Sequence, residues 1–350
     1  MTPPDDAREL VGEYVTGLQH TRVHRSAHGG FVWWHRPGAL RPGPLAAPAA
    51  TAVPDLSGLP GAALLVTPVP FGDGLLHRAR GAVSAVTWLA DPRPGARQLA
   101  AHALAAAGRS LRALHGTPLP PGLPPGPPEA LRRMRAWADG ADGLLPGAAR
   151  LREETLAAWG SARMERVRAW WEEAVAPPVP SLIHGGASLG ALIPPLHRGR
   201  TALLTGEDLA AASPALDLGW LLGDLAELAW SAGRYGAPGP SGAPAGASDT
   251  PGPSDIPGGP DLRQVLLAGY GLGGSGGLDG LGGLGGPDGP DGPDGPDPAA
   301  VARAAVLRVV THMQDFASYC DWSDELHDYI AFTAELIDEE GRRAVPGGTS

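Results

Sequence analysis

A cluster of histidines near the N-terminus is the first group of side chains that could do chemistry. The cluster contains His20, His24, His28 and His35, and imidazole is the commonest metal ligand among side chains. Zinc sites usually add cysteine thiolates or carboxylates at a matched spacing. The only cysteine, Cys320, lies far along the chain, and no carboxylates are spaced to match. The spacing therefore does not favour a zinc site.

Two patterns typical of other enzymes are incomplete. Ser188 lies in ASLGA, which lacks the Gly-x-Ser-x-Gly frame of a hydrolase nucleophile. The stretch GLGGSGGLDG, residues 271–280, follows no expected strand and opens no expected helix, as a dinucleotide-binding loop would have to do. The sequence predicts neither kind of site.

The basic residues are all of one kind. All 27 of them are arginine, and the chain contains no lysine. Strong compositional bias is one explanation, but the chemical consequence does not depend on it. No side chain can form a Schiff base or serve as a phosphate-pairing lysine.

The composition indicates a soluble globular protein. The chain has 350 residues, of which 43% are hydrophobic, and this is enough to bury a large core. The single cysteine excludes an internal disulfide, and the first residues lack the basic and apolar regions of a signal peptide. No stretch approaches the ~18 apolar residues of a membrane span. We therefore expect a cytoplasmic protein.

Two tracts rich in glycine and proline, residues 236–260 and 271–298, interrupt the chain. Segments of this kind lack apolar anchors and are typical of disorder. Seven of the 37 acidic residues lie in them, which leaves 30 acids against 27 bases elsewhere. A nearly neutral body has no basic patch for nucleic acid or a membrane surface, so we expect neither partner.

Local patterns predict elements in the first half of the chain. Residues 5–18 show apolar residues at helical spacing after an acidic cap, which predicts a helix. Two β-prone runs flank His28-Gly29-Gly30 and predict a hairpin. A short buried strand at 62–67 and helices at 97–115, 129–138 and 151–174 follow.

The second half of the chain reads as a strand and loop followed by helices. Residues 179–183 form a strand that enters a His-Gly-Gly loop, and residues 201–204 pair with 191–193. Ser213-Pro214 has the preferred residues for a helix start. Further helices are expected at 261–270, 301–320 and 323–340.

Three blocks resemble the aminoglycoside phosphotransferase and choline kinase-like family, whose members are two-lobed relatives of protein kinases. The block LLVTPVPFG (64–72) is similar to the hinge strand between the lobes, and GRSLRALHGTPLP (108–120) to a helix that ends in Leu-His. The most specific block runs from LIHGGASLGALI through DLGWLLGDLAEL, within residues 181–228.

The resemblance implies that the catalytic positions of that family are changed. Its loop reads His-Gly-Asp, with an Asn five residues beyond the Asp and a metal-binding Asp on the next hairpin. In this chain these three positions are Gly186, Ala191 and Thr205. Gly and Ala offer no oxygen to a base or metal role, and loss of a catalytic base typically costs ~10²- to 10⁴-fold in rate.

Other positions receive roles from the same resemblance. It implies a structural role for His184 within the loop rather than one as nucleophile or base, and a bracing role for Asp217. Arg36 would stand near the lysine that pairs with nucleotide phosphates. Glu207 and Asp208 follow Thr205 closely, so a small shift of the alignment would make either a metal ligand. The alternative is that they form a solvated turn in which Asp208 caps the next segment.

The expected architecture is α+β, a protein kinase-like fold with two lobes. Residues 1–68 would form a reduced, β-rich N-terminal lobe. Residues 69–350 would form a mainly helical C-terminal lobe with disordered insertions at 236–260 and 271–298.

Three functions remain open at this point. The first is a pseudokinase that keeps the cleft and binds a small molecule or a protein partner. The second is an active phosphotransferase that uses ATP and Mg²⁺ on a small hydroxylated metabolite or antibiotic, with Glu207 or Asp208 as metal ligand. The third is a scaffold or regulatory subunit without catalysis. Cofactors other than those of the second function are unknown.

Overall fold

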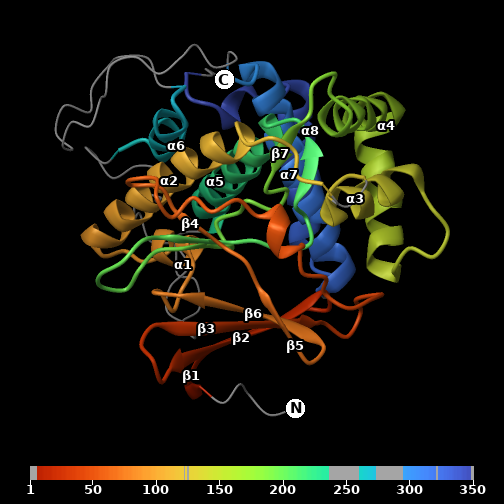
Figure 1. The fold of residues 1–350 in the computed structure, drawn as a ribbon. Coiled ribbons are helices and arrows are strands. Elements are labelled where there is room, and N and C mark those ends of the chain that lie inside the picture. Colours follow the sequence, from red (N-terminus) through yellow and green to blue (C-terminus); the bar gives the residue numbers. More distant parts are fainter. Residues whose placement is uncertain are drawn as a thin grey trace.

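The fold, taken from a computed structural model, combines a β-sheet formed by the first part of the chain with a larger helical body (Figure 1). The structure describes residues 6–121, 123, 126–235, 260–272, 295–320 and 322–347. The sheet lies against one side of the helices, as expected for the α+β, two-lobed architecture. That fold prediction is confirmed.

The N-terminal sheet is antiparallel and five-stranded. Its spatial order is β1-β2-β3-β6-β5, with consecutive strands antiparallel. The strands are β1 (Ala7–Val15), β2 (Gln19–Ser26), β3 (Phe31–Pro37), β5 (Val69–Phe71) and β6 (Gly74–Ala79). The hairpin predicted around residues 28–30 is therefore confirmed as β2 and β3.

Strand β3 separates two small cores, since successive side chains of a strand point to opposite faces. Phe31 and Trp33 pack on one face with Ile193 and Leu204 of the helical body. Trp34 packs on the other face in a cluster that includes Leu76. The first face joins the sheet to the rest of the molecule.

The helix predicted for residues 5–18 is wrong. Residues 7–15 form β1 and residues 16–18 belong to the turn into β2, and β1 pairs along its length with β2. The apolar residues that suggested a helix, such as Leu10 and Tyr14, remain exposed on this edge strand. Cross-strand pairing outweighs a weak local pattern here, and irregular pairing between Ala7 and Gly12 disturbs the alternation that would have identified a strand.

A second sheet carries the loop region. β4 (Leu64–Val66) runs parallel to β9 (Ala202–Leu204), which pairs antiparallel with β8 (Leu192–Ile193). The predicted pairing of 191–193 with 201–204 is thus confirmed. β7 (Ser181–Ile183) pairs with β10 (Ala210–Ala212) in a separate, two-stranded sheet.

The sheet of the N-terminal lobe extends beyond the boundary expected at residue 68, because β5 and β6 belong to it. The chain leaves the sheet after Ala79 and enters the first helix at Ala85. Residues 80–84 therefore make this connection, whereas the segment 64–72, expected to be the hinge, contributes β4 and β5. Residues 38–63, all of them described, contain one short 3-10 helix, η1 (Ala50–Ala52), and no α-helix.

The helical body follows the predicted order closely. α2, α3 and α4 correspond to the helices expected at 97–115, 129–138 and 151–174, and α5 begins just after Ser213-Pro214. The helices are α1 (Ala85–Leu89), α2 (Pro94–His115), α3 (Glu129–Asp139), α4 (Pro146–Val175), α5 (Ala215–Tyr235), α6 (Leu262–Tyr270), α7 (Pro298–Tyr319) and α8 (Glu325–Asp338), with a 3-10 turn η2 (Arg342–Ala344).

Helices α5 and α7 pack closely at the centre of this body. A Cβ atom added at Gly219 of α5 would lie 2.4 Å from the Cβ of Ala304, and one added at Gly223 would lie 2.7 Å from the carbonyl oxygen of Ala305. Glycine at these positions therefore lets the two backbones approach.

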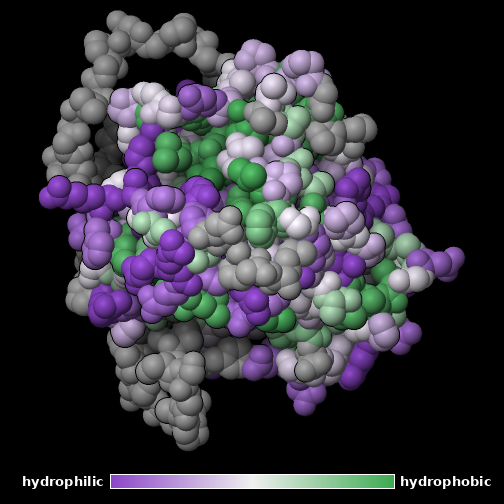
Figure 2. Space-filling model, turned by 60° about the horizontal axis from the view of Figure 1, so that its bottom comes forward, coloured by the Kyte–Doolittle hydropathy of each residue, from purple (hydrophilic) through white to green (hydrophobic). Residues whose placement is uncertain are grey.

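The expected disorder of residues 236–260 and 271–298 falls mostly on residues 236–259 and 273–294, which lie outside the described part of the chain. Pro298 itself is helical and begins α7. On the face shown in Figure 2, hydrophobic side chains form small groups separated by hydrophilic ones. Among the described helices, none has the length and apolar character needed to span a bilayer.

The close approach of α5 and α7 makes a stability prediction. Gly219→Ala should lower the free energy of unfolding by about 1–3 kcal/mol, because the added methyl meets a packed backbone. The matched control is Gly233→Ala on the same helix, where a Cβ would meet nothing within 4 Å. This control should gain up to about 1 kcal/mol from helix propensity. Urea unfolding of both variants measures the difference, and equal stabilities would contradict the packing.

Candidate functional site

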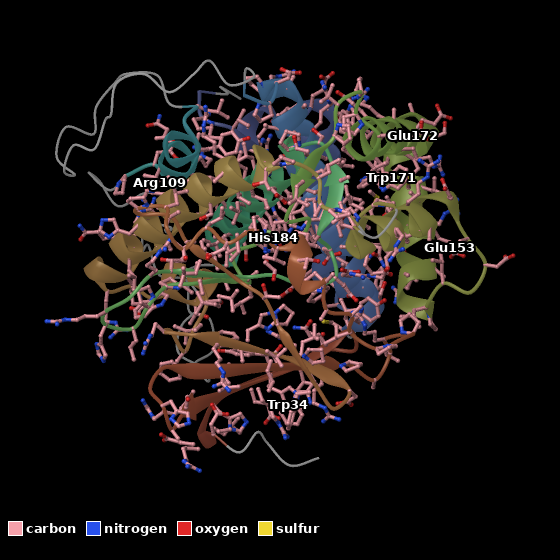
Figure 3. The ribbon with its side chains drawn as sticks, viewed as in Figure 1. Trp34, Arg109, Glu153, Trp171, Glu172 and His184 are labelled. Atoms are coloured by element: carbon pink, nitrogen blue, oxygen red, sulfur yellow. The ribbon has the colours of Figure 1, made fainter. Side chains whose placement is uncertain are left out.

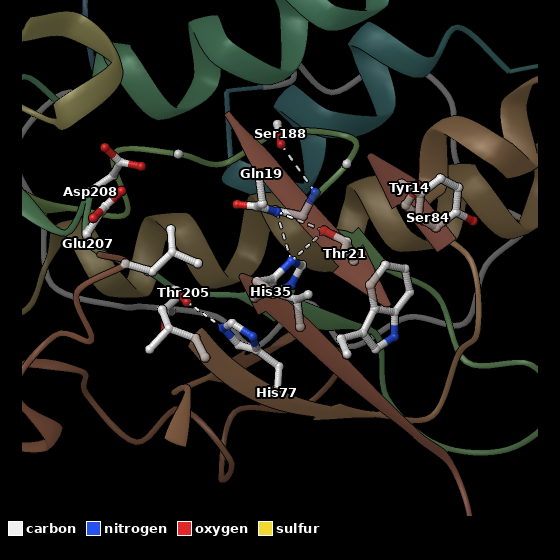
Figure 4. Close-up of a pocket in the computed structure, with 18 of the residues that line it drawn as sticks. Tyr14, Gln19, Thr21, His35, His77, Ser84, Ser188, Thr205, Glu207 and Asp208 are labelled. Carbon is white, nitrogen blue, oxygen red and sulfur yellow. Dashed lines mark hydrogen bonds between the residues drawn. The ribbon is translucent and has the colours of Figure 1, made fainter. Parts of the chain in front are cut away.

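A cavity of about 450 Å³ lies between the N-terminal sheet and the loop region of the helical body (Figure 4). Its wall includes the histidine that Figure 3 shows near the middle of the molecule, His184. The cavity also includes every position that the sequence assigned to catalysis or metal binding. These are His184, Gly186, Ala191, Thr205, Glu207 and Asp208.

Strands β2, β3 and β6 supply a polar wall of four side chains. Gln19 Nε2 donates hydrogen bonds to Thr21 Oγ1 (3.0 Å) and to His35 Nδ1 (2.8 Å). The Thr21 hydroxyl also lies 2.8 Å from His35 Nδ1. On β6, His77 Nε2 donates to the carbonyl oxygen of Thr205 at 2.7 Å. The His35 and His77 rings meet edge to face, with centroids 5.1 Å apart.

Both histidines of this wall are held neutral. Burial, with the nearby His77 adding to it, lowers the pKa of His35 to about 3. Burial also lowers the pKa of His77 to about 4, although the Thr205 carbonyl opposes the change. At neutral pH the wall therefore carries hydrogen-bonding groups without charge.

His184 is buried within the loop that follows β7. Its Nε2 donates to the carbonyl oxygen of Leu204 at 3.1 Å, and its Nδ1 accepts from the backbone N–H of Gly186 at 3.3 Å. Burial lowers the pKa of this histidine as well. Both ring nitrogens are used to hold the loop, and the contacts are those of a structural residue.

Asp217, near the start of α5, holds the backbone of the same loop. Its carboxylate accepts hydrogen bonds from the backbone N–H groups of His184 (2.7 Å) and Gly185 (2.8 Å). It also lies 3.0 Å from Nε2 of His115, the last residue of α2. Burial would raise the pKa of Asp217, but the contacts with His115 and His184 together outweigh it and the pKa is lowered. These are the contacts of a bracing residue.

The three positions that the resemblance assigns to catalysis and metal binding have few free polar groups. Thr205 is 2% exposed, and its hydroxyl donates to the carbonyl oxygen of Val66 at 2.9 Å. A Cβ added at Gly186 would lie 3.3 Å from Oδ2 of Asp208. Ala191 brings only a methyl group to the cavity. No oxygen of these three side chains is directed to a ligand.

Glu207 is engaged with the segment that follows β3. It forms an ion pair with the largely buried Arg41, and its Oε2 accepts from the backbone N–H of Ala46 at 3.3 Å. Leu45 of that segment lines the cavity. Glu207 therefore links the irregular segment after β3 to the cavity wall.

Asp208 caps a helix that lies elsewhere in the sequence. Its Oδ1 accepts from the backbone N–H of Glu129 at 2.7 Å, and Ala130 supplies a second backbone contact. These are the first residues of α3, whose own preceding residue, Pro128, provides no side-chain cap. Burial, reinforced by the charge of Glu207, raises the pKa of Asp208 to about 6. The sequence suggested that Asp208 caps the following segment, whereas it caps α3.

Arg36 lies on the face of β3 opposite His35 and is absent from the cavity lining. Its Nε and Nη2 donate to the Asp73 carboxylate at 3.0 and 2.8 Å, and its guanidinium lies over the Trp34 ring. The alternation of a strand places every second residue on the same face. This geometry opposes the cofactor role expected for Arg36 and brings His35 to the cavity instead.

Several residues of the polar wall were not singled out from the sequence. His77 lies on β6, a strand that was not predicted, and Gln19 and Thr21 carry no motif. The usable signal is the alternation of β2 and β3, which places Thr21, Trp33 and His35 on one side. Among the described residues, no group of three or more His, Cys, Asp or Glu side chains is arranged to hold a metal ion.

Comparison with known protein families and with curated protein sequences finds no match. Similar solved structures include a choline kinase from Cryptosporidium parvum (11% identity, covering 97% of this chain and 90% of that one, TM-score 0.44). An ethanolamine kinase from Plasmodium vivax shares 10% identity (97% and 84% covered, TM-score 0.48). An aminoglycoside phosphotransferase from Streptomyces rimosus shares 18% identity (76% and 87% covered, TM-score 0.36).

These similarities fall on the same group of kinases as the resemblance in the sequence motifs. With identities of 10–18% and TM-scores below 0.5, these structures carry no argument about what this protein does. The function of this protein must therefore be argued from its own cavity.

The capping contact of Asp208 can be tested by comparing two replacements. Asp208→Asn keeps an oxygen that accepts from the α3 backbone, whereas Asp208→Ala removes it. We expect the Ala variant to be less stable than the Asn variant by about 1 kcal/mol, the usual effect of a lost helix cap. Chemical unfolding of both proteins measures this difference. Equal stability of the two would show that the carboxylate does not cap α3.

The neutral histidines predict a loss of stability in acid. A histidine whose folded pKa is depressed stabilises nothing above its unfolded pKa of about 6.5, and the folded state loses stability as pH falls from there toward the folded pKa. For His77, with a pKa of about 4, the loss should reach about 2 kcal/mol near pH 5.

The measurement compares urea unfolding at about pH 7.5 and pH 5 for the wild type and for His77→Gln. Other titrating groups are common to both proteins, so their effects cancel in the difference. The variant should lose about 2 kcal/mol less than the wild type on acidification. An identical pH response would mean that His77 titrates normally.

Proposed function

We propose that this protein binds an uncharged small molecule in the cavity and does not transfer a phosphoryl group. The observation that carries the proposal is the charge of the cavity wall. Among its described lining residues there is no arginine, the chain has no lysine, and the histidines of the wall are held neutral by burial. Within the part of the lining that the structure describes, the charged side chains are the carboxylates of Glu207 and Asp208.

A nucleoside triphosphate is poorly matched to such a wall. Sites for this ligand neutralise its phosphates with Lys or Arg, with a divalent metal, or with backbone N–H groups at a glycine-rich turn. The turn between β1 and β2 is already engaged, since Gly17 donates its N–H to the Tyr319 carbonyl at 2.8 Å. Glu207 is already paired with Arg41, and the carboxylate of Asp208 would repel the phosphates.

The connection between sheet and helices is also engaged by the protein itself. The carbonyl oxygen of Arg80 accepts from the N–H of Leu196 at 3.1 Å. That of Gly81 accepts from the indole N–H of Trp33 at 3.0 Å. A base placed against this connection would have to share these two acceptors with donors of the protein.

An active phosphotransferase is the second candidate, because Glu207 and Asp208 both line the cavity. Mg²⁺ is bound by carboxylates together with substrate phosphates. Both carboxylates already have partners: Glu207 is paired with Arg41, and Oδ1 of Asp208 accepts from the first residue of α3. A metal ion would compete with these contacts, so the binding function fits the observed geometry better.

Calorimetry with ATP separates the two candidates. We expect no binding of ATP, with or without Mg²⁺, at concentrations that saturate ATP-dependent kinases, because the cavity lining offers no cation to the phosphates. Tight binding of ATP that requires Mg²⁺ would overturn the proposal. The same titration with the Glu207→Gln, Asp208→Asn double variant shows whether any such binding depends on these carboxylates.

A phosphotransfer assay with the single variant Gly186→Asp provides a second arm. The new carboxylate would lie beside Asp208, while the lysine and a free metal ligand would still be absent. We expect no turnover of ATP by this variant. Measurable turnover would show that the chain retains a working phosphotransfer site.

A further inference from the structure

Leu45 is the one large apolar residue of the described cavity lining that lies outside any strand or helix. The other large apolar residues of the lining belong to regular elements; they are Tyr14, Trp33, Leu75, Val86 and Leu204. In such elements, hydrogen bonds between backbone groups fix the chain that carries each side chain. The backbone at Leu45 must be held in another way.

Leu45 belongs to residues 41–47, a strap that is anchored at both ends. Before the strap, Leu40 donates its N–H at 2.8 Å to a carbonyl oxygen in the turn between β1 and β2. After it, Pro48 is buried, and Ala52 lies in the core of the helical body. Of the strap residues, Leu45 is the one that lines the cavity.

Both carboxylate oxygens of Glu207 hold the strap. Oε1 is paired with the guanidinium of Arg41, and Oε2 accepts from the backbone N–H of Ala46 at 3.3 Å. Within the strap, Arg41 Nε donates to the carbonyl oxygen of Gly43 at 3.1 Å. The two contacts of Glu207 thus flank Leu45 on either side along the chain. Glu207 itself lies at one side of the cavity, next to Asp208 (Figure 4).

The ion pair that holds the strap is shielded from water. The side chain of Arg41 is 9% exposed and that of Glu207 is 19% exposed. Removing one partner of a shielded pair is costly, because it leaves the other charge without compensation. The pair can therefore fix the backbone around Leu45 more firmly than an ion pair on the open surface could.

We propose that Leu45 sets the size of the ligand that the cavity accepts, and that Glu207 and Arg41 are the positioning residues that hold Leu45 in the wall. This inference rests on the proposed function, since it concerns the ligand of the same cavity. Leucine at this place excludes bulky groups by steric clash, whereas a smaller side chain or a released strap admits them. Glu207 then serves the cavity through Leu45 and not as a metal ligand.

The test uses a cysteine in the cavity as a reporter of the space available. Ala191→Cys places a thiol on the lining, and Cys320→Ser removes the native one. Two methanethiosulfonate reagents are compared in the full chain, one that carries a methyl group and one that carries a benzyl group. The measured quantity is the ratio of their reaction rates, in which changes in the reactivity of the thiol cancel.

Leu45→Ala should raise the rate of the benzyl reagent about 10-fold and leave that of the methyl reagent nearly unchanged. Arg41→Met should have the same effect, although Arg41 lies outside the described lining, because it releases the strap. Combining the two replacements should add little, since both act through Leu45. Arg41→Lys keeps a cation for Glu207 and should retain most of the wild-type ratio.

The matched control is Arg36→Met, which removes an ion pair with Asp73 in the same sheet and should leave the ratio unchanged. A general loosening of the fold would speed up both reagents, whereas the release of Leu45 speeds up the benzyl reagent alone.

An unchanged ratio in Leu45→Ala would overturn the role of Leu45 in setting ligand size. An unchanged ratio in Arg41→Met, or additive effects in the double variant, would overturn the positioning role of the ion pair. The proposed function would survive these results and fails only if ATP binds in a metal-dependent manner.

Discussion

The buried carboxylate of Asp217 is the interaction on which the cavity depends. It is 1% exposed and receives two backbone N–H groups of the loop and the ring of His115. His115 in turn contacts the Tyr270 hydroxyl at 2.8 Å, so α2, α5 and α6 meet at one charge. A buried carboxylate without such partners would be strongly destabilising. Its need for donors fixes where the loop runs.

The same constraint explains why the cavity is poor in charge. Each ionised group near it is already matched by the protein: Asp217 by the loop, Glu207 by Arg41, and Asp208 by the start of α3. A carboxylate that makes such a contact is less available to a ligand, because breaking any of the three contacts leaves a buried charge without a partner. What remains for a ligand is a set of neutral polar side chains, among them Gln19, Thr21, His35 and Ser84.

Sequence reasoning succeeded where the local pattern and the final packing agree. The helices from α2 onward are long and follow clear start signals such as Ser213-Pro214, and the pairing of β8 with β9 follows from two short apolar runs. It failed for residues 5–18, where an irregularly paired edge strand imitates helical spacing. Most of the helical body could therefore be predicted, and the first strand could not.

The site was predictable in position but not in contacts. The loop motif placed His184, Gly186, Ala191 and Thr205 at one cavity, yet the partners of Asp208 lie on α3, far away in sequence. No spacing rule connects them. Likewise, Arg36 points away from the cavity because successive side chains of β3 alternate between the two faces of the sheet. Which residues share a face becomes clear only once the strand is known.

The conformation of the loop does not depend on the side chains at residues 186 and 191. Its shape is fixed through backbone groups: Asp217 holds the N–H groups of His184 and Gly185, and Asp224, also on α5, holds that of Leu189 at 2.7 Å. Side chains at 186 and 191 take no part in these contacts. The loop therefore needs no side-chain oxygen at these two positions to keep its conformation, because the carboxylates that hold it belong to α5.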